Sequence, residues 1–140
     1  MPSVDLVNRA YDAVKLRNLE ALLNIFSKDC VFLDMTELGV LVGHEEFAKY
    51  MNMTWDAFPD FHPAEAVFTA QGNVVAAELV LQGTHQGKFL GLEPSGVTVQ
   101  WQAAAFYTID NMRNQIVREV FYYDSNRLRT ILADAGTRRS

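Results

Sequence analysis

Apolar residues in the first part of the chain recur every three or four positions, which is the period of an amphipathic helix. A first helix is predicted to begin near Ser3 and Asp5, and its apolar stripe consists of Val7, Ala10, Tyr11 and Val14. A second is predicted after Asn18, a residue suited to an N-cap, with the stripe Leu19, Leu22, Leu23 and Phe26. A third is predicted from His44 to about Trp55, and Phe58-Pro59-Asp60 ends it because proline disfavours helix in the preceding residue.

The period changes to two beyond Pro63, as expected for strands. Strands are predicted over residues 62–70, 74–83, 97–110 and 115–123, with a shorter one over 30–34 that ends at Asp34 and is followed by a turn at Gly39. A short helix containing Leu128, Ile131 and Leu132 is predicted to close the chain. Helices followed by antiparallel strands predict an α+β fold, with one domain over residues 1–140.

Composition and charge narrow the class of protein. The formal net charge is -5 and the pI about 5.1, which disfavours nucleic acid as a partner because phosphate binding needs a basic surface. No apolar run approaches the roughly 18 residues of a membrane span. Cys30 is the one cysteine, so it cannot form an internal disulfide and is expected to be a packing residue. Residues 1–5 lack the features of a secretory signal, so a cytoplasmic location is expected.

Asp34 is the first candidate for chemistry, because it places a carboxylate at the end of an otherwise apolar strand. A carboxylate in an apolar cavity has a raised pKa and can act as a general base near neutral pH. The alternative is a turn in which Asp34 bonds the backbone of Thr36 or Glu37. Which of the two holds depends on whether Asp34 faces a cavity or water.

Three segments resemble the SnoaL-like polyketide cyclase family of the nuclear-transport-factor-two-like superfamily. Ala57-Phe58-Pro59-Asp60 is similar to the motif that ends the family's third helix, and residues 83–96 are similar to its GTHxGxFxGxxPTG segment. Residues 115–124 are similar to its last strand, with Asn114 in place of the turn glycine. The resemblance implies a cone-shaped curved antiparallel sheet with three N-terminal helices on its concave face, an internal pocket and a homodimer. It does not fix the reaction, because one fold hosts many functions.

The ketosteroid isomerases of the same superfamily offer a comparison by residue. Their catalytic base lies nine residues before a glycine that opens the third helix, as Asp34 lies before Gly43 here. Their oxyanion tyrosine lies late in the first helix, where this chain has Tyr11. Their second oxyanion donor is an acid on a later strand, and residues 102–105 here contain none. The cyclases place an aspartate on the last strand, at the position that aligns with Phe121.

Further polar residues are candidates for the pocket. His85 is a possible base at the pocket mouth or else a backbone-bonded histidine, and Gln102 is a candidate amide donor. Glu119 either lines the pocket or faces out, whereas Asp124 is better explained as the N-cap of the last helix. Tyr11 is a pocket donor or a core tyrosine. The aromatic residues expected in both core and pocket wall are Phe26, Phe32, Trp55, Phe58, Phe89, Phe121 and Tyr123.

Two readings of the function remain open. The three histidines have no metal-like spacing and no glycine-rich phosphate loop opens a helix, so neither a metal nor a cofactor is expected. The first reading is a cofactor-independent enzyme in which Asp34, or else His85, takes a proton from a carbon beside a carbonyl, while Tyr11 and Gln102 bind the enolate oxygen. The second is a binding domain for a small hydrophobic ligand that has lost its chemistry.

Overall fold

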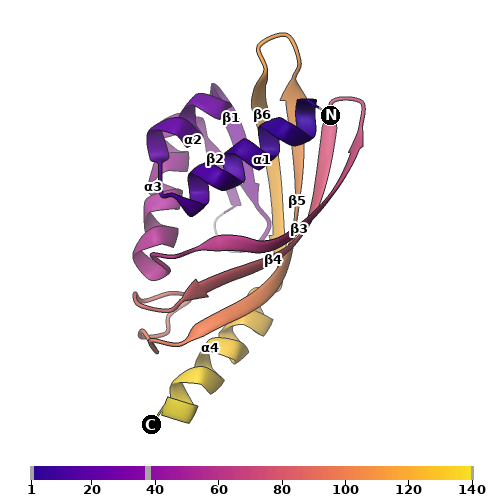
Figure 1. The fold of residues 1–140 in the computed structure, drawn as a ribbon. Coiled ribbons are helices and arrows are strands. Elements are labelled where there is room, and N and C mark those ends of the chain that lie inside the picture. The colour runs from indigo at the N-terminus through magenta and orange to yellow at the C-terminus, as the bar shows by residue number, and fades with distance from the viewer. Residues whose placement is uncertain (1, 37–38, 140) are drawn as a thin grey trace.

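The computed structural model describes residues 2–36 and 39–139, and Figure 1 shows a curved sheet with the first three helices packed on one side. The helices are α1 (Pro2–Lys15), α2 (Leu19–Ile25), α3 (Gly43–Ala57) and α4 (Ser125–Arg139), and the strands are β1 (Phe26–Asp34), β2 (Gly39–Val42), β3 (His62–Gln71), β4 (Val74–Thr84), β5 (Thr98–Asp110) and β6 (Gln115–Tyr123). The strands form one six-stranded sheet in the order β2-β1-β6-β5-β4-β3. This confirms the predicted α+β class.

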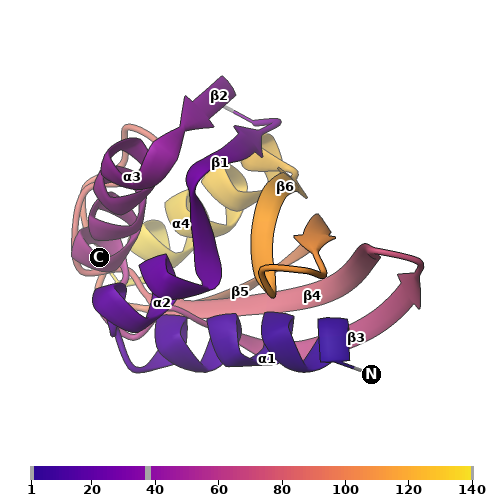
Figure 2. The ribbon, with the colours of Figure 1, turned by 90° about the horizontal axis from the view of Figure 1, so that it is seen from above.

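The core lies between the concave face of the sheet and α1 to α3, as Figure 2 shows from above. Alternation along the strands produces this arrangement, because successive side chains point to opposite faces. In β5, for example, Trp101, Ala105 and Tyr107 are buried whereas Gln102 and Phe106 are exposed. The helices supply the facing layer, in which Val7, Ala10 and Val14 of the predicted first stripe and Leu22 of the second are buried.

The sheet is mixed rather than wholly antiparallel. β1 runs parallel to β6, with Phe32 opposite Glu119 and Asp34 opposite Phe121. The chain reaches β6 only after β2, α3 and the strands β3 to β5, a long connection of the kind that parallel neighbours need. The residues after Asp34 were expected to form a turn, but residues 39–42 form the edge strand β2, which pairs antiparallel with β1.

β1 begins earlier than predicted. Phe26, expected in the stripe of the second helix, has extended backbone and is the first residue of the strand. A buried Phe26 fits the end of a helix stripe as well as the start of a strand, so the hydrophobic pattern could not distinguish helix from strand here. Asn18 caps α2 as predicted, its Oδ1 accepting a hydrogen bond from the Ala21 N–H at 3.1 Å.

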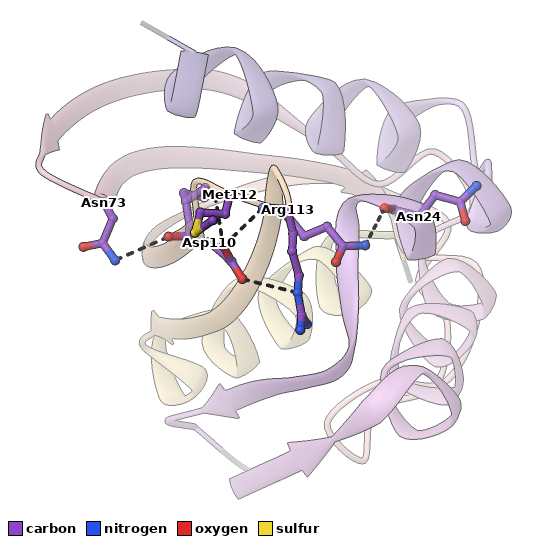
Figure 3. A network of polar contacts seen from close by, with 7 residues as sticks. Asn24, Asn73, Asp110, Met112 and Arg113 are labelled. Carbon is purple, nitrogen blue, oxygen red and sulfur yellow. Dashed lines mark hydrogen bonds and ion pairs between the residues drawn. The ribbon is translucent and has the colours of Figure 1, made fainter.

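The turn between β5 and β6 is held by polar contacts at the tip of the hairpin (Figure 3). The Asp110 carboxylate accepts hydrogen bonds from the backbone N–H groups of Met112 and Arg113 at 3.0 and 3.2 Å. Asn114, which stands where the family has glycine, adopts a positive φ of 55°. Two residues further on, the pairing slips by one, since Ile109 pairs with Ile116 but Thr108 with Arg118. This bulge decides which β6 side chains enter the core.

The last helix is longer than the short one expected. α4 extends from Ser125 to Arg139, and Leu128 and Leu132 on it are buried. The Asp124 carboxylate accepts a hydrogen bond from the Arg127 N–H at 3.0 Å, which confirms its role as an N-cap. No helix in the described part of the chain is long and apolar enough to cross a membrane.

Candidate functional site

The concave side of the sheet encloses an apolar cavity of about 70 Å³. All three N-terminal helices and strands β1, β3, β4, β5 and β6, with Phe61 just before β3, contribute to its lining. The polar groups in the lining are Tyr11, Tyr50, Thr54, Tyr107 and Glu119. A carboxyl group and several hydroxyls in an apolar wall have the composition expected of a ligand site.

Glu119 is the acid that lines the cavity. It is 7% exposed, and burial raises its pKa from 4.5 to about 8, with the nearby Asp34 carboxylate adding to the rise. A hydrogen bond with Tyr107 acts in the opposite direction. Glu119 is therefore mostly protonated at pH 7, when an ordinary glutamate is ionised.

Tyr107 links Glu119 to Tyr11. It lies directly opposite Glu119 in the β5–β6 pairing, and its hydroxyl also donates to the Tyr11 hydroxyl at 2.9 Å. Burial raises the pKa of both tyrosines. The carboxyl group of Glu119 and the hydroxyls of Tyr107 and Tyr11 therefore form a continuous chain of hydrogen bonds. We call it the hydroxyl chain, and it runs along the wall of the cavity from the sheet to α1.

Asp34 is 3% exposed and is the last residue of β1. Its Oδ1 accepts hydrogen bonds from the Thr36 N–H at 2.8 Å and from the Thr36 hydroxyl, so the expected turn is present as well as the burial. Glu37, the other expected turn partner, lies outside the described residues. Tyr50 on α3 donates its hydroxyl to Asp34 and lines the cavity, whereas Asp34 itself is not part of the lining. Asp34 is therefore connected to the cavity through Tyr50.

A second, smaller cavity of about 20 Å³ lies beside the first. Phe58, Phe89, Trp101 and Tyr123 line this second cavity alone. The residues that line both cavities are Tyr50, Thr54, Phe61, Leu81 and Phe121. We call these five side chains the dividing wall. Of the expected aromatic lining, Phe26 and Phe32 belong to the first cavity, Phe121 to both, and Phe58, Phe89 and Tyr123 to the second.

His85 does not line either cavity, which corrects its expected role as a base. It is 0% exposed, and its Nδ1 accepts a hydrogen bond from the Ser95 N–H at 3.3 Å. Burial lowers its pKa, although hydrogen bonds with the backbone of Gly87 and Leu92 act in the opposite direction. The ring lies 5.6 Å from that of Phe58 and holds the loop after β4 in place.

Two further expectations are corrected. Gln102 is exposed on the outer face of β5, because it alternates with the inward-facing Trp101 and Ala103. Trp55 is buried but lines neither cavity, and its Nε1–H donates to the carbonyl of Val14 at 3.3 Å. That bond ties α3 to the end of α1, so Trp55 has a packing role.

The first two family motifs meet at one end of the sheet. Asp60 of the first motif accepts two hydrogen bonds from Thr84 of the second, from its N–H and its hydroxyl, each at 2.7 Å. Burial tends to raise the pKa of Asp60, but these hydrogen bonds lower it by more, so the pKa is below its ordinary value. Gly87 lies so close to α3 that a Cβ there would be 2.3 Å from the Asp56 carbonyl oxygen. These motif residues therefore have a structural role, because they hold the end of α3 against the end of β4.

Tyr107 and Tyr50 are site residues that the sequence analysis missed. Alternation along β5 places Tyr107 on the inward face, but nothing in the sequence pairs it with Glu119, because the bulge in β6 sets that register. Tyr50 falls within the predicted third helix, but its sequence context did not mark it as a site residue. No three His, Cys, Asp or Glu side chains in residues 2–36 and 39–139 are grouped as a metal ion would require.

The fold defines the nuclear-transport-factor-two-like class, and comparison with known proteins gives the family. The chain belongs to the SnoaL-like polyketide cyclase family, whose sequence pattern matches residues 5–130. This confirms the resemblance inferred from the motifs. No curated protein matches the chain.

Solved structures agree with this assignment. A protein from Xanthomonas campestris pv. campestris, described as a "putative polyketide cyclase", is 25% identical with a TM-score of 0.82, over 96% of each chain. One from Pseudomonas putida KT2440 with the same description is 27% identical with a TM-score of 0.80, over 90% of this chain and 94% of that one. TerC, co-crystallised with polyporic acid, is 14% identical with a TM-score of 0.77, over 95% of this chain and 99% of that one. At this identity the likeness shows the shared fold alone.

Proposed function

We propose that this protein is a cofactor-independent acid–base enzyme of the cyclase or isomerase type. Its substrate is a small, mostly apolar carbonyl compound that binds in the first cavity. Asp34 removes a proton from the carbon beside the carbonyl, and Tyr11 donates a hydrogen bond to the oxygen that becomes negative. The observation that carries the proposal is the hydrogen-bonded chain from a protonated, buried Glu119 through Tyr107 to Tyr11.

The protonation of Glu119 sets the direction of this chain. Tyr107 has one hydroxyl hydrogen, so it donates to one neighbour at a time. When Glu119 carries its proton, it donates to Tyr107, Tyr107 donates to Tyr11, and the hydrogen of Tyr11 is left for the substrate oxygen. When Glu119 is ionised, Tyr107 and then Tyr11 turn towards the carboxylate and the donor to the substrate is lost. A positioned donor of this kind is worth about 10²–10³-fold in rate.

Asp34 and Glu119 would then divide the acid and base roles. They lie on the same face of two neighbouring parallel strands, close enough for the charge of Asp34 to raise the pKa of Glu119. Thr36 and Tyr50 donate hydrogen bonds to the Asp34 carboxylate and hold it in one orientation. Two carboxyl groups held in different environments are a common basis for acid–base chemistry. Access to Asp34 requires a movement of Tyr50.

The second candidate is a non-catalytic binding domain, and one observation favours it. The position that aligns with the cyclase aspartate is Phe121, so the family's usual acid is absent. The two candidates differ in whether protons are transferred, and not in whether a ligand binds.

Hydrogen–deuterium exchange separates them. Small ketones such as butanone and cyclopentanone are incubated with the protein in D₂O, and exchange beside the carbonyl is followed by NMR. We expect the protein to exchange these hydrogens faster than buffer alone does. The exchange rate should fall about 10²-fold or more in Asp34→Asn. It should also decline as the pH rises through about 8, where Glu119 ionises. Asp124→Asn, which alters only the cap of α4, is the control and should keep the activity. Ketone binding without any catalysed exchange would favour the binding domain instead.

We further propose a homodimer formed through the outer face of the sheet. The support is a group of apolar side chains on that face, where Val67 is 64%, Phe106 43% and Tyr122 44% exposed. Grouped apolar surface of this kind is unusual on a monomer. Light scattering should give the mass of two chains, and Phe106→Lys should reduce it to that of one. A monomer mass for the unmodified protein at micromolar concentration would contradict the proposal.

A further inference from the structure

The cavity that serves as the candidate site is divided from its neighbour by side chains alone. The dividing wall separates the first cavity of about 70 Å³ from the second of about 20 Å³. An engineered apolar cavity of about 150 Å³ holds one benzene molecule. In the present arrangement neither cavity holds a six-membered ring, so the wall limits the size of any ligand.

The ring of Phe121, a member of the wall, lies beside aromatic rings on both sides. Its ring lies 6.3 Å from that of Phe32, which lines only the first cavity, and 5.4 Å from that of Tyr123, which lines only the second. Its backbone is fixed in β6, between β1 and β5. The ring is therefore held at the junction by strands on both sides.

Three of the other four wall residues are less suited to control size. Tyr50 is occupied by its hydrogen bond to Asp34. Thr54 is small, and its hydroxyl donates to the Tyr50 carbonyl at 3.1 Å. Phe61 precedes β3 and is only half-buried. Removing the ring of Phe121 would join the cavities and add space for about one six-carbon ring.

We propose that Phe121 is a specificity-determining residue that restricts the site to ligands smaller than a six-membered ring. The inference rests on the proposed function only in treating the first cavity as the ligand site. It narrows the substrate class to carbonyl compounds of a few carbons. The position where related cyclases carry an acid would then control size in this protein.

Phenol binding tests this inference, with isothermal titration calorimetry on the whole chain. We expect Phe121→Ala to bind phenol at least ten times more tightly than the unmodified protein, with Phe121→Leu in between. Ile116→Ala is the control, because Ile116 is fully buried in the same strand but lines neither cavity. It should gain no phenol binding, which separates a joined cavity from general loosening of the core.

Each outcome decides the question. Equal phenol binding by the unmodified protein and Phe121→Ala would overturn the inference, as would an equal gain in Ile116→Ala or no gain in any variant. If Phe121→Ala does not fold, Phe121→Leu is judged by the same comparison. Phenol binding needs no proton transfer, so failure of ketone exchange would remove the proposed enzyme activity and leave this result standing.

Discussion

Replacing Glu119 with glutamine should make the protein more stable at high pH. The pKa of Glu119 is about 8 in the folded protein and near 4.5 in an unfolded chain. A group whose pKa is raised by folding stabilises the folded protein fully at pH values below its pKa in the unfolded chain. This stabilisation is lost as the pH rises to the pKa of the group in the folded protein. From pH 4.5 to pH 8 the unmodified protein should therefore lose about 5 kcal/mol of unfolding free energy, at 1.36 kcal/mol per pKa unit. The glutamine side chain of the Glu119→Gln variant cannot ionise, so this variant should avoid the loss.

The assay is urea denaturation of both proteins at several pH values between 4.5 and 8.5. At pH 4.5 the two should agree within about 1 kcal/mol, since glutamine has nearly the shape of the protonated acid and the two differ by one hydrogen bond at most. By pH 8 Glu119→Gln should be more stable by several kcal/mol. Glu78→Gln, the same change at an exposed position on β4, shows the effect of the substitution itself. A stability difference for Glu119→Gln that did not grow with pH would refute the protonated, buried Glu119 and the direction of the hydroxyl chain.

Three further substitutions test how the fold and the site are held together, each by urea denaturation. Gly87→Ala should cost at least about 2 kcal/mol, because its Cβ would lie 2.3 Å from the Asp56 carbonyl oxygen; an effect below about 0.5 kcal/mol would contradict the close packing. Gly136→Ala, in α4 with no atom within 4 Å of its Cβ, should instead add about 0.5–1 kcal/mol. Tyr107→Phe should cost about 1–3 kcal/mol by leaving a buried partner unsatisfied, and should shift the pH dependence attributed to Glu119 upward.

Most of the fold could be predicted from the sequence, because the hydrophobic period is a local signal. The long strands β3 to β6 and the helices α1 and α3 show it along most of their length. The edge strand β2 could not be predicted in this way. It has four residues, three of them exposed, and Val40 is 59% exposed. Its structure comes from pairing with β1, which a local pattern does not report.

The candidate site was predictable only in part, because register is a tertiary property. Alternation correctly placed Glu119, Phe121 and Tyr123 on one face, and all three line a cavity. Counting back from the turn would instead pair Tyr107 with Arg118, since Asp110 pairs with Gln115. The bulge in β6 shifts this pairing by one residue. Without that shift, no hydroxyl would stand opposite Glu119.

The motifs that identify the family and the residues proposed for its chemistry lie in different parts of this protein. Asp60, Thr84 and Gly87 join the end of α3 to the end of β4, and their geometry leaves little freedom for substitution. Tyr107 and Glu119 face the cavity from the middle of two strands, where any inward-facing side chain of suitable volume could be accommodated. Such a scaffold can keep its motifs while its cavity changes. Family membership therefore fixes the shape of this protein, whereas its reaction must be established from the side chains along the cavity wall.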